Sequence, residues 1–185
     1  QETIVNKRDI PSPYFSVVYN THTKNVGREY WAMQLMSMVL GQLPNSFLFQ
    51  EVREKRSLCY FIRSLIVGYD GVMIVTSGVR DGSEDEAIEL VSLQIERLKN
   101  NEVSEELFAS AKRMLINSIY QTDDSNRRIV DSEYRRYILE ENINSAQLID
   151  LIESIERYEI VDIAHRLDLN TVYKMVKGAD HEKNH

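Results

Sequence analysis

The alternation of apolar and polar residues divides the chain into strands and helices. Four apolar stretches predict strands at 14–19, 58–67, 72–79 and 171–176. Asp70-Gly71 is a dipeptide typical of hairpin turns, so the second and third of these strands are expected to pair as antiparallel neighbours.

Helical periodicity accounts for most of the remaining chain. Apolar residues three and four positions apart predict helices at 28–40, 46–56, 83–98, 104–119, 130–141, 145–157 and 159–167. Ser83 and Glu86 form a predicted capping box, and Ser104 is the predicted start of the next helix. The element order predicts an α+β fold: a mixed, mainly antiparallel sheet of about four or more strands, with helices packed on one face.

The composition fits one domain. With 185 residues, 43% of them hydrophobic and 28% charged, the chain can fill a single core and does not resemble a disordered segment. We predict a linker at 1–12, a folded domain at 13–178 and a polar tail at 179–185. A net charge of −7 argues against nucleic-acid binding, because the chain would repel phosphates. The longest mostly apolar run, 30–40, is too short to span a bilayer.

Cysteine usage and the N-terminal residues bear on the compartment. Cys59 is the single cysteine, so no internal disulfide can form. The N-terminal residues QETIVNKRD contain no apolar segment of the kind found in signal peptides. Both observations favour a cytoplasmic location, although many secreted proteins also lack disulfides.

The tail contains a zinc-like motif, since residues His181–His185 spell H-E-x-x-H. A working zinc site needs a stable helix, a third ligand and a buried wall around the metal. This motif occupies the last five residues without an apolar flank, and neither His22 nor His165 is an evident third ligand. A frayed tail is the favoured interpretation, and we predict no metal site in this chain.

Three other features favour structural roles over chemical ones. Cys59 follows basic residues that would lower its pKa, but no histidine is placed to act as its base. His165 lies beside the apolar face of its predicted helix. A group of arginines alternates with acidic residues, which predicts an ion-paired helix face and not a basic patch; its members are Arg127, Arg128, Arg135 and Arg136.

The most specific signal is the stretch 40–63, LGQLPNSFLFQEVREKRSLCYFIR. It predicts a turn, a charged amphipathic helix that carries Arg53 near its end, and a strand that carries Tyr60. From the residues alone, Arg53 could serve only to complement the helix dipole, and Tyr60 could be an ordinary half-buried strand residue.

This stretch resembles a segment of the pitrilysin-type (insulinase-like) zinc peptidases, whose pattern is L-G-G-x-x-S-S-x-L-F-x-x-(I/V)-R-E-K-x-G-L-A-Y. The matching residues are Leu40, Gly41, Ser46, Leu48, Phe49, Val52, Arg53, Glu54, Lys55, Leu58 and Tyr60. The departures are Gln42 and Leu43 in the glycine loop, Ser57 in place of Gly and Cys59 in place of Ala. The order of the other predicted elements is also similar, so the resemblance covers about residues 13–178.

The resemblance implies a place for this chain in a larger enzyme. In that family, homologous α+β domains enclose a chamber, and the N-terminal half holds zinc through H-x-x-E-H and a distant Glu. The C-terminal half contributes an Arg and a Tyr with the spacing of Arg53 and Tyr60. Since H-x-x-E-H is absent here, the resemblance implies the C-terminal, non-zinc-binding domain, which is expected to be inactive alone.

The implied partners are peptide substrates and a zinc-bearing half, either in the same polypeptide or as a heterodimer partner. Tyr60 would stabilise the oxyanion of the reaction and Arg53 would hold a substrate carbonyl. The chain itself would bind no cofactor, and zinc would belong to the complementary half. Two alternatives stay open: a non-catalytic scaffold or assembly subunit of the same fold, and a free-standing peptide-binding module.

Overall fold

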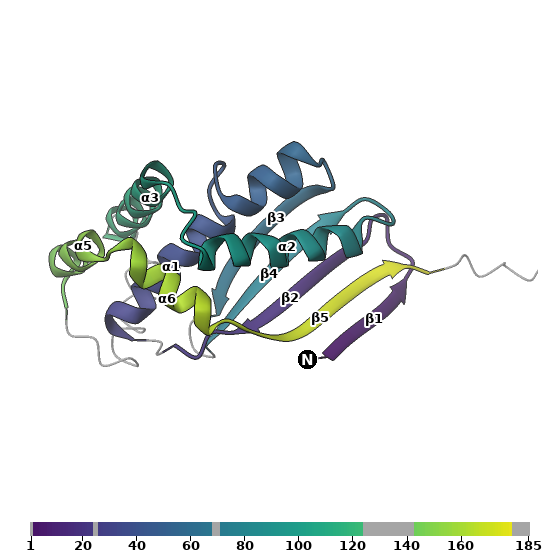
Figure 1. Ribbon diagram of the computed structural model, residues 1–185, viewed down its shortest axis with the longest axis horizontal. Helices are drawn as coiled ribbons and strands as arrows, with labels where there is room; N and C mark the ends of the chain where they lie inside the picture. The colour runs from purple at the N-terminus through teal and green to yellow at the C-terminus, as the bar shows by residue number, and fades with distance from the viewer. Residues whose placement is uncertain (1, 24–25, 68–70, 124–142, 179–185) are drawn as a thin grey trace, which may run out of the picture.

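The chain folds around a five-stranded mixed sheet (Figure 1). The structure is a computed structural model that describes residues 2–23, 26–67, 71–123 and 143–178. The strands are β1 (Glu2–Arg8), β2 (Tyr14–Asn20), β3 (Cys59–Val67), β4 (Val72–Val79) and β5 (Asp168–Lys177). These described strands lie in the order β1-β5-β2-β4-β3, and among them only β1 and β5 are parallel neighbours. The predicted mainly antiparallel sheet is confirmed.

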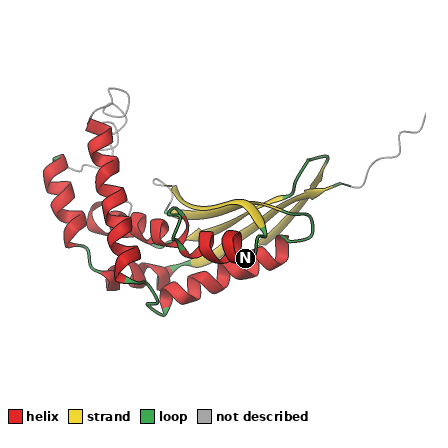
Figure 2. Ribbon diagram, turned by 90° about the horizontal axis from the view of Figure 1, so that it is seen from above, coloured by secondary structure: helices red, strands yellow, loops and turns green. Residues whose placement is uncertain are grey.

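The helices gather on one side of this sheet (Figure 2). Those described are α1 (Gly27–Gly41), the π-helix η1 (Phe49–Lys55), α2 (Glu84–Lys99), α3 (Glu105–Asp123), α5 (Ser145–Ser154) and α6 (Arg157–Arg166). The alternation in β2 shows why: Phe15, Val17 and Tyr19 are buried against the helices, while the residues between them face the other way. The predicted α+β layering, with helices on one face, is confirmed.

The core is centred on α1. The sequence predicts a wide apolar face for this helix, and the structure buries it on nearly every side. It packs against β3, and also against α2, α3, α5 and α6. Met33, Leu35, Met36 and Leu40 are fully buried there. The loop that follows α1 therefore starts from a rigid support.

β1 lies within the segment 1–12, where the sequence predicts a linker. All its residues except Asn6 are exposed. Because neither face of the strand is buried, its sequence does not show the alternation of apolar and polar residues that predicts a strand. Backbone pairing with β5 defines it instead. The expectation of a segment without a strand was wrong, whereas the division into linker, domain and tail stays a prediction.

The two predicted helix starts have different outcomes. The Ser104 hydroxyl accepts a hydrogen bond from Leu107 N–H at 3.2 Å, as expected of a capping residue. Ser83 makes no capping hydrogen bond, because its φ of −99° and ψ of 3° are not the extended conformation that capping requires. Its N–H donates to the carbonyl of Arg80 in a turn instead.

Several predictions lie wholly or partly outside the described residues. They concern the turn at 70–71, the helix at 130–141, the arginines at 127–136 and the tail motif at 181–185. The antiparallel pairing of β3 with β4 on either side of the turn is confirmed. Within the described ranges, no helix is long and apolar enough to cross a membrane.

Candidate functional site

Arg53 lies in an unusual helical segment. Phe49–Lys55 form a π-helix, in which the backbone hydrogen bonds are wider than in an α-helix. Such segments occur frequently at functional sites. The helix ends at a tight turn, where Ser57 N–H donates to the Arg53 carbonyl at 3.0 Å and Leu58 N–H donates to the Val52 carbonyl at 3.1 Å.

The Arg53 side chain is held by an aromatic ring and a carboxylate. Its guanidinium carbon lies 4.6 Å from the centre of the Phe49 ring, which is the geometry of a cation–π contact. Its Nε is 3.8 Å from a carboxylate oxygen of Glu54. The side chain nonetheless keeps 43% of its surface exposed, so much of the guanidinium faces solvent.

Tyr60 lies in a β-bulge at the start of β3. Cys59 pairs with Val79 and Phe61 pairs with Gly78, so Tyr60 has no residue opposite it. Strict alternation would bury one of two consecutive strand residues, but Tyr60 is 64% exposed and Phe61 is 44% exposed. Bulges redirect side chains in this way and are common beside active sites.

A strained residue connects η1 to β3. Ser57 has φ of +53°, in the left-handed region that glycine adopts most easily. The peptidase pattern has Gly at this position, and this chain has Ser57 instead. The substitution therefore lies at a residue of the turn whose backbone conformation favours glycine. The chain keeps the turn despite the substitution, and Tyr60 follows it three residues later.

β3 is anchored to the end of α1 by small side chains. The Ser37 hydroxyl donates to Ser64 Oγ at 2.9 Å, and the Ser64 hydroxyl donates to the Ser37 carbonyl at 2.6 Å. Gly41 permits this approach, because a Cβ there would lie 2.9 Å from the backbone nitrogen of Ser64. The family-like glycine therefore holds the Tyr60 strand against the core.

Cys59 lies between the two candidate residues and is buried. Burial raises the pKa of its thiol above the ordinary value, while the Ser77 hydroxyl and the charge of Arg53 act in the opposite direction without cancelling the effect. A raised pKa disfavours the thiolate that a nucleophile requires. The structural interpretation of Cys59 is thereby supported.

Arg53 and Tyr60 thus come from adjacent elements, η1 and β3, which pack on each other. No hydrogen bond joins their side chains, and Tyr60 Oη makes none to any described residue. Both polar groups are exposed and can accept an external partner. The sequence named both residues as candidates, and their roles stay a prediction; it did not predict the π-helix or the bulge on which they lie.

The described histidines do not form a metal site. His22 Nε2 lies 4.0 Å from an Asp168 carboxylate oxygen, and His165 Nε2 lies 3.1 Å from the Lys99 carbonyl. In the part of the chain that the structure describes, no group of three or more His, Cys, Asp or Glu side chains is arranged to hold a metal ion. These residues therefore do not fit a catalytic zinc, which needs three protein ligands.

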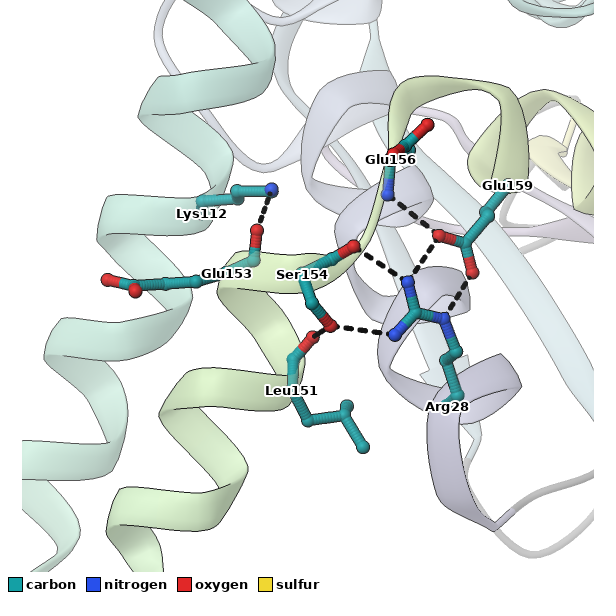
Figure 3. Close-up of polar contacts among 7 residues, drawn as sticks. All are labelled: Arg28, Lys112, Leu151, Glu153, Ser154, Glu156 and Glu159. Carbon is teal, nitrogen blue, oxygen red and sulfur yellow. Dashed lines mark hydrogen bonds and ion pairs between the residues drawn. The ribbon is translucent and has the colours of Figure 1, made fainter.

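A second polar site was missed by the sequence analysis (Figure 3). Arg28, at the start of α1, donates to both carboxylate oxygens of Glu159 at 2.6 and 2.7 Å, and to the hydroxyl and carbonyl oxygens of Ser154 at 2.7 Å. Lys112 Nζ donates to the Glu153 carbonyl at 2.7 Å. These partners are far apart along the chain, so no local motif could indicate the cluster.

An open hollow of about 830 Å³ lies beside this cluster, between α3 and the turn from α5 to α6. Burial lowers the pKa of Lys112 in its wall, against the pull of neighbouring glutamates. The wall mixes acidic and basic groups, so its charge favours no single ligand class. Its lining residues include Glu105, Phe108, Lys112, Glu153, Glu156 and Arg157.

Solved structures share this fold at low sequence identity. A conserved protein from Enterococcus faecalis V583 superposes with a TM-score of 0.91 at 24% identity, over 98% of this chain and 43% of that one. A protease from Helicobacter pylori gives 0.83 at 14% identity, over 94% of this chain and 43% of that one. The Peptidase M16 inactive domain from Pseudomonas fluorescens gives 0.76 at 17% identity, over 96% and 44%.

Sequence comparison identifies the family. A Bacillus subtilis (strain 168) protein named "Probable inactive metalloprotease YmfF" is 25% identical over 177 residues, which are 96% of this chain and 41% of that protein. The present chain thus spans less than half the length of that relative. Residues 1–115 match the family described as "Peptidase M16 inactive domain". The chain therefore belongs to the Peptidase M16 inactive domain family, which confirms its resemblance to the C-terminal domain of pitrilysin-type peptidases.

Proposed function

We propose that this chain is the substrate-binding half of a zinc-dependent endopeptidase or processing peptidase. Family membership makes it the non-catalytic domain of a zinc-protease family. The zinc would be held by another domain of the same polypeptide or by a partner subunit. The observation that carries the proposal is the pairing of a π-helix with a β-bulge, which together expose Arg53 and Tyr60 on adjacent elements.

Tyr60 and Arg53 have complementary roles in this proposal. The exposed Tyr60 phenol donates a hydrogen bond to the substrate carbonyl oxygen, which becomes negatively charged in the transition state. The planar fork of Arg53 holds a neighbouring substrate carbonyl through its N–H groups. Zinc in the complementary half would polarise the scissile carbonyl and activate water.

The position of β3 suggests how a peptide binds. β3 is an edge strand of the sheet, so one side of its backbone pairs with no other strand in the described part of the chain. An extended peptide that adds to this edge is held through main-chain hydrogen bonds and needs no particular sequence. Tyr60 lies at the start of the same strand, which brings its phenol close to the bound backbone.

The proposal is tested by mixing this chain with its zinc-bearing half and measuring peptide cleavage. Tyr60→Phe should lower kcat by about 100-fold or more, as the loss of one oxyanion donor does in other enzymes. Arg53→Ala should weaken peptide binding. Matched controls are Tyr158→Phe, at a tyrosine that is 59% exposed, and Arg113→Ala, on the exposed side of α3. If the site variants lose no more activity than the controls, the proposed roles are wrong.

A scaffold or assembly subunit is the second candidate. The observation in its favour is the name of the Bacillus subtilis relative, which describes that protein as an inactive metalloprotease. A scaffold predicts a stable complex with the zinc-bearing half and turnover that is insensitive to Tyr60→Phe and Arg53→Ala. A cytoplasmic location is part of our proposal; it is supported by the lone cysteine, whose thiol is buried and unpaired.

A further inference from the structure

β1 presents an open edge of the sheet. Among the strands that the structure describes, it is the outermost one, and it pairs with β5 alone. Ile4 and Val5 are 40% and 54% exposed, which is a large exposure for apolar residues at the centre of a strand. Exposed edges of this kind pair readily with another strand.

The backbone geometry fixes which residues face the open side. Gly178 N–H donates to the Arg8 carbonyl at 2.8 Å, so the polar backbone groups of Arg8 face β5. Successive residues of a strand direct these groups to opposite sides, so those of Asn6 and Ile4 also face β5. The N–H and C=O groups of Thr3, Val5 and Lys7 therefore face outward, away from the sheet.

We propose that this edge pairs antiparallel with the same edge of a second copy of the chain. A two-fold axis through Val5 places Glu2 opposite Arg8 of the second copy, Thr3 opposite Lys7, Ile4 opposite Asn6, and Val5 opposite itself. The interface is self-complementary, as a two-fold dimer requires. The outward backbone groups of Thr3, Val5 and Lys7 form the ladder, and the sheets of the two copies become continuous.

Charge complementarity selects this register. Among the described residues, Glu2, Lys7 and Arg8 take part in no ion pair, so their charges are available to a partner. The axis at Val5 pairs all seven residues of β1 (Glu2–Arg8) and forms two opposite-charge pairs, one at each end. An axis at Ile4 or Asn6 leaves residues unpaired and gives no opposite-charge pair. Opposite charges directly across a strand pair are favourable, and like charges are not.

The lysine on this edge does not oppose the pairing. Lysines on edge strands often prevent association, because like charges would meet in a dimer. Here Lys7 lies opposite Thr3 of the second copy, and the two Lys7 side chains are at opposite ends of the ladder. The charges on β1 therefore disfavour pairing in a shifted register, in which like charges approach each other, and permit the register centred on Val5.

The experiment is a charge-reversal series on this chain, measured by sedimentation equilibrium at chain concentrations from about 1 μM to about 1 mM. Glu2→Arg alone and Arg8→Glu alone each place like charges at both ends, so each should weaken dimerisation by roughly tenfold or more. An equimolar mixture of the two variants should form a heterodimer, since each charge then meets its opposite. The double variant should recover the dimer of the unmodified chain.

Val5→Pro tests the backbone ladder separately. It removes an outward N–H and leaves the hydrogen bonds between β1 and β5, so the fold should be kept, as circular dichroism can verify. The dimer should weaken by roughly tenfold or more in this variant. A monomer at every concentration, or a dimer that neither charge reversal nor Val5→Pro weakens, would overturn the proposal.

A third outcome assigns the edge to another occupant. If the chain is monomeric and hydrogen exchange shows the amides of Thr3, Val5 and Lys7 protected only when the zinc-bearing half is added, that half binds this edge and the self-pairing is wrong. The inference does not rest on the proposed peptidase role, because it concerns the opposite edge of the sheet from β3.

Discussion

The guanidinium of Arg53 stacks on the ring of Phe49, with its central carbon 4.6 Å from the ring centre. Both residues belong to the π-helix η1, four positions apart. The stack restricts the orientation of a long side chain that would otherwise sample many rotamers, and it leaves the outer N–H groups of the fork accessible. A substrate carbonyl would therefore meet an arginine that is already oriented.

Arg53→Lys should impair peptide binding nearly as much as Arg53→Ala. Lysine keeps the charge but lacks the planar fork that stacks on Phe49 and donates two parallel hydrogen bonds. We expect a loss of about 1.5–3 kcal/mol in peptide affinity, the value of a hydrogen bond to a charged group. Titration calorimetry with the zinc-bearing half present measures it. A lysine variant that binds like the parent would show that charge alone matters at this position.

Ser57→Gly should stabilise the chain. Ser57 has φ of +53°, and a left-handed conformation costs a residue with a Cβ about 1–2 kcal/mol. Glycine removes that cost but loses more entropy on folding, so the net gain in the free energy of unfolding should be about 0.5–1 kcal/mol. Urea denaturation measures it.

Ser83→Gly is the matched control, because Ser83 has φ of −99° and gains nothing from glycine. It should be neutral or destabilising. Equal effects of the two substitutions would mean that the turn at Ser57 is not strained. The Ser57→Gly variant also tests whether strain in this turn is needed to position Tyr60. If it affects stability alone, the rate of peptide cleavage should not change.

The sequence predicted the elements that alternate in burial and missed those that do not. The strand at 72–79 was found with its bounds, because its inner residues are buried and its outer ones are not. β1 was missed because both of its faces are exposed, so nothing selected for alternation. Pairing with a strand about 170 positions away creates β1, and no local pattern encodes such a partner.

The sequence named the residues of the candidate site, whose roles stay a prediction, and did not predict the geometry around them. Arg53 and Tyr60 were identified through a resemblance, and the structure adds the π-helix and the bulge. A bulge depends on how two strands register, which one strand's sequence does not determine. The cluster around Arg28 had no signal at all, because Glu159 is 131 positions away along the chain.

Gly41→Ala should destabilise the chain and displace β3. A Cβ at Gly41 would lie 2.9 Å from the Ser64 backbone nitrogen and 2.9 Å from Leu48 Cδ1, and the backbone atom cannot move without the strand. We expect a loss of about 1–3 kcal/mol in the free energy of unfolding, as for other overpacked sites. The control is Gly178→Ala, whose Cβ would meet its nearest atoms at 3.6 Å, an ordinary contact. Equal stability of both variants would contradict the close approach of α1 to β3.

The ion pair between Arg28 and Glu159 should make stability depend on acid pH. Burial raises the pKa of Glu159, but hydrogen bonds from Arg28 and from Glu156 N–H, together with the charges of Arg28 and Lys112, outweigh it and leave the pKa below its ordinary value of 4.5. A carboxyl whose folded-state pKa is lowered contributes stability that is fully present above the unfolded-state pKa. That contribution is lost as the pH falls through the lowered, folded-state pKa.

Glu159→Gln should therefore be less stable than the parent at neutral pH, and the difference should shrink as the pH falls below the ordinary carboxyl pKa and through the lowered pKa of Glu159. Urea denaturation across this range measures both chains. Glu89→Gln is the control, because Glu89 is exposed and makes no ion pair with any described residue. Its difference from the parent at neutral pH should be small. If the difference in the free energy of unfolding between Glu159→Gln and the parent does not change with pH, the carboxylate charge is not what stabilises the Arg28 contact. The contact would then contribute through its hydrogen-bond geometry, because the glutamine amide oxygen can still accept one hydrogen bond but the amide does not titrate.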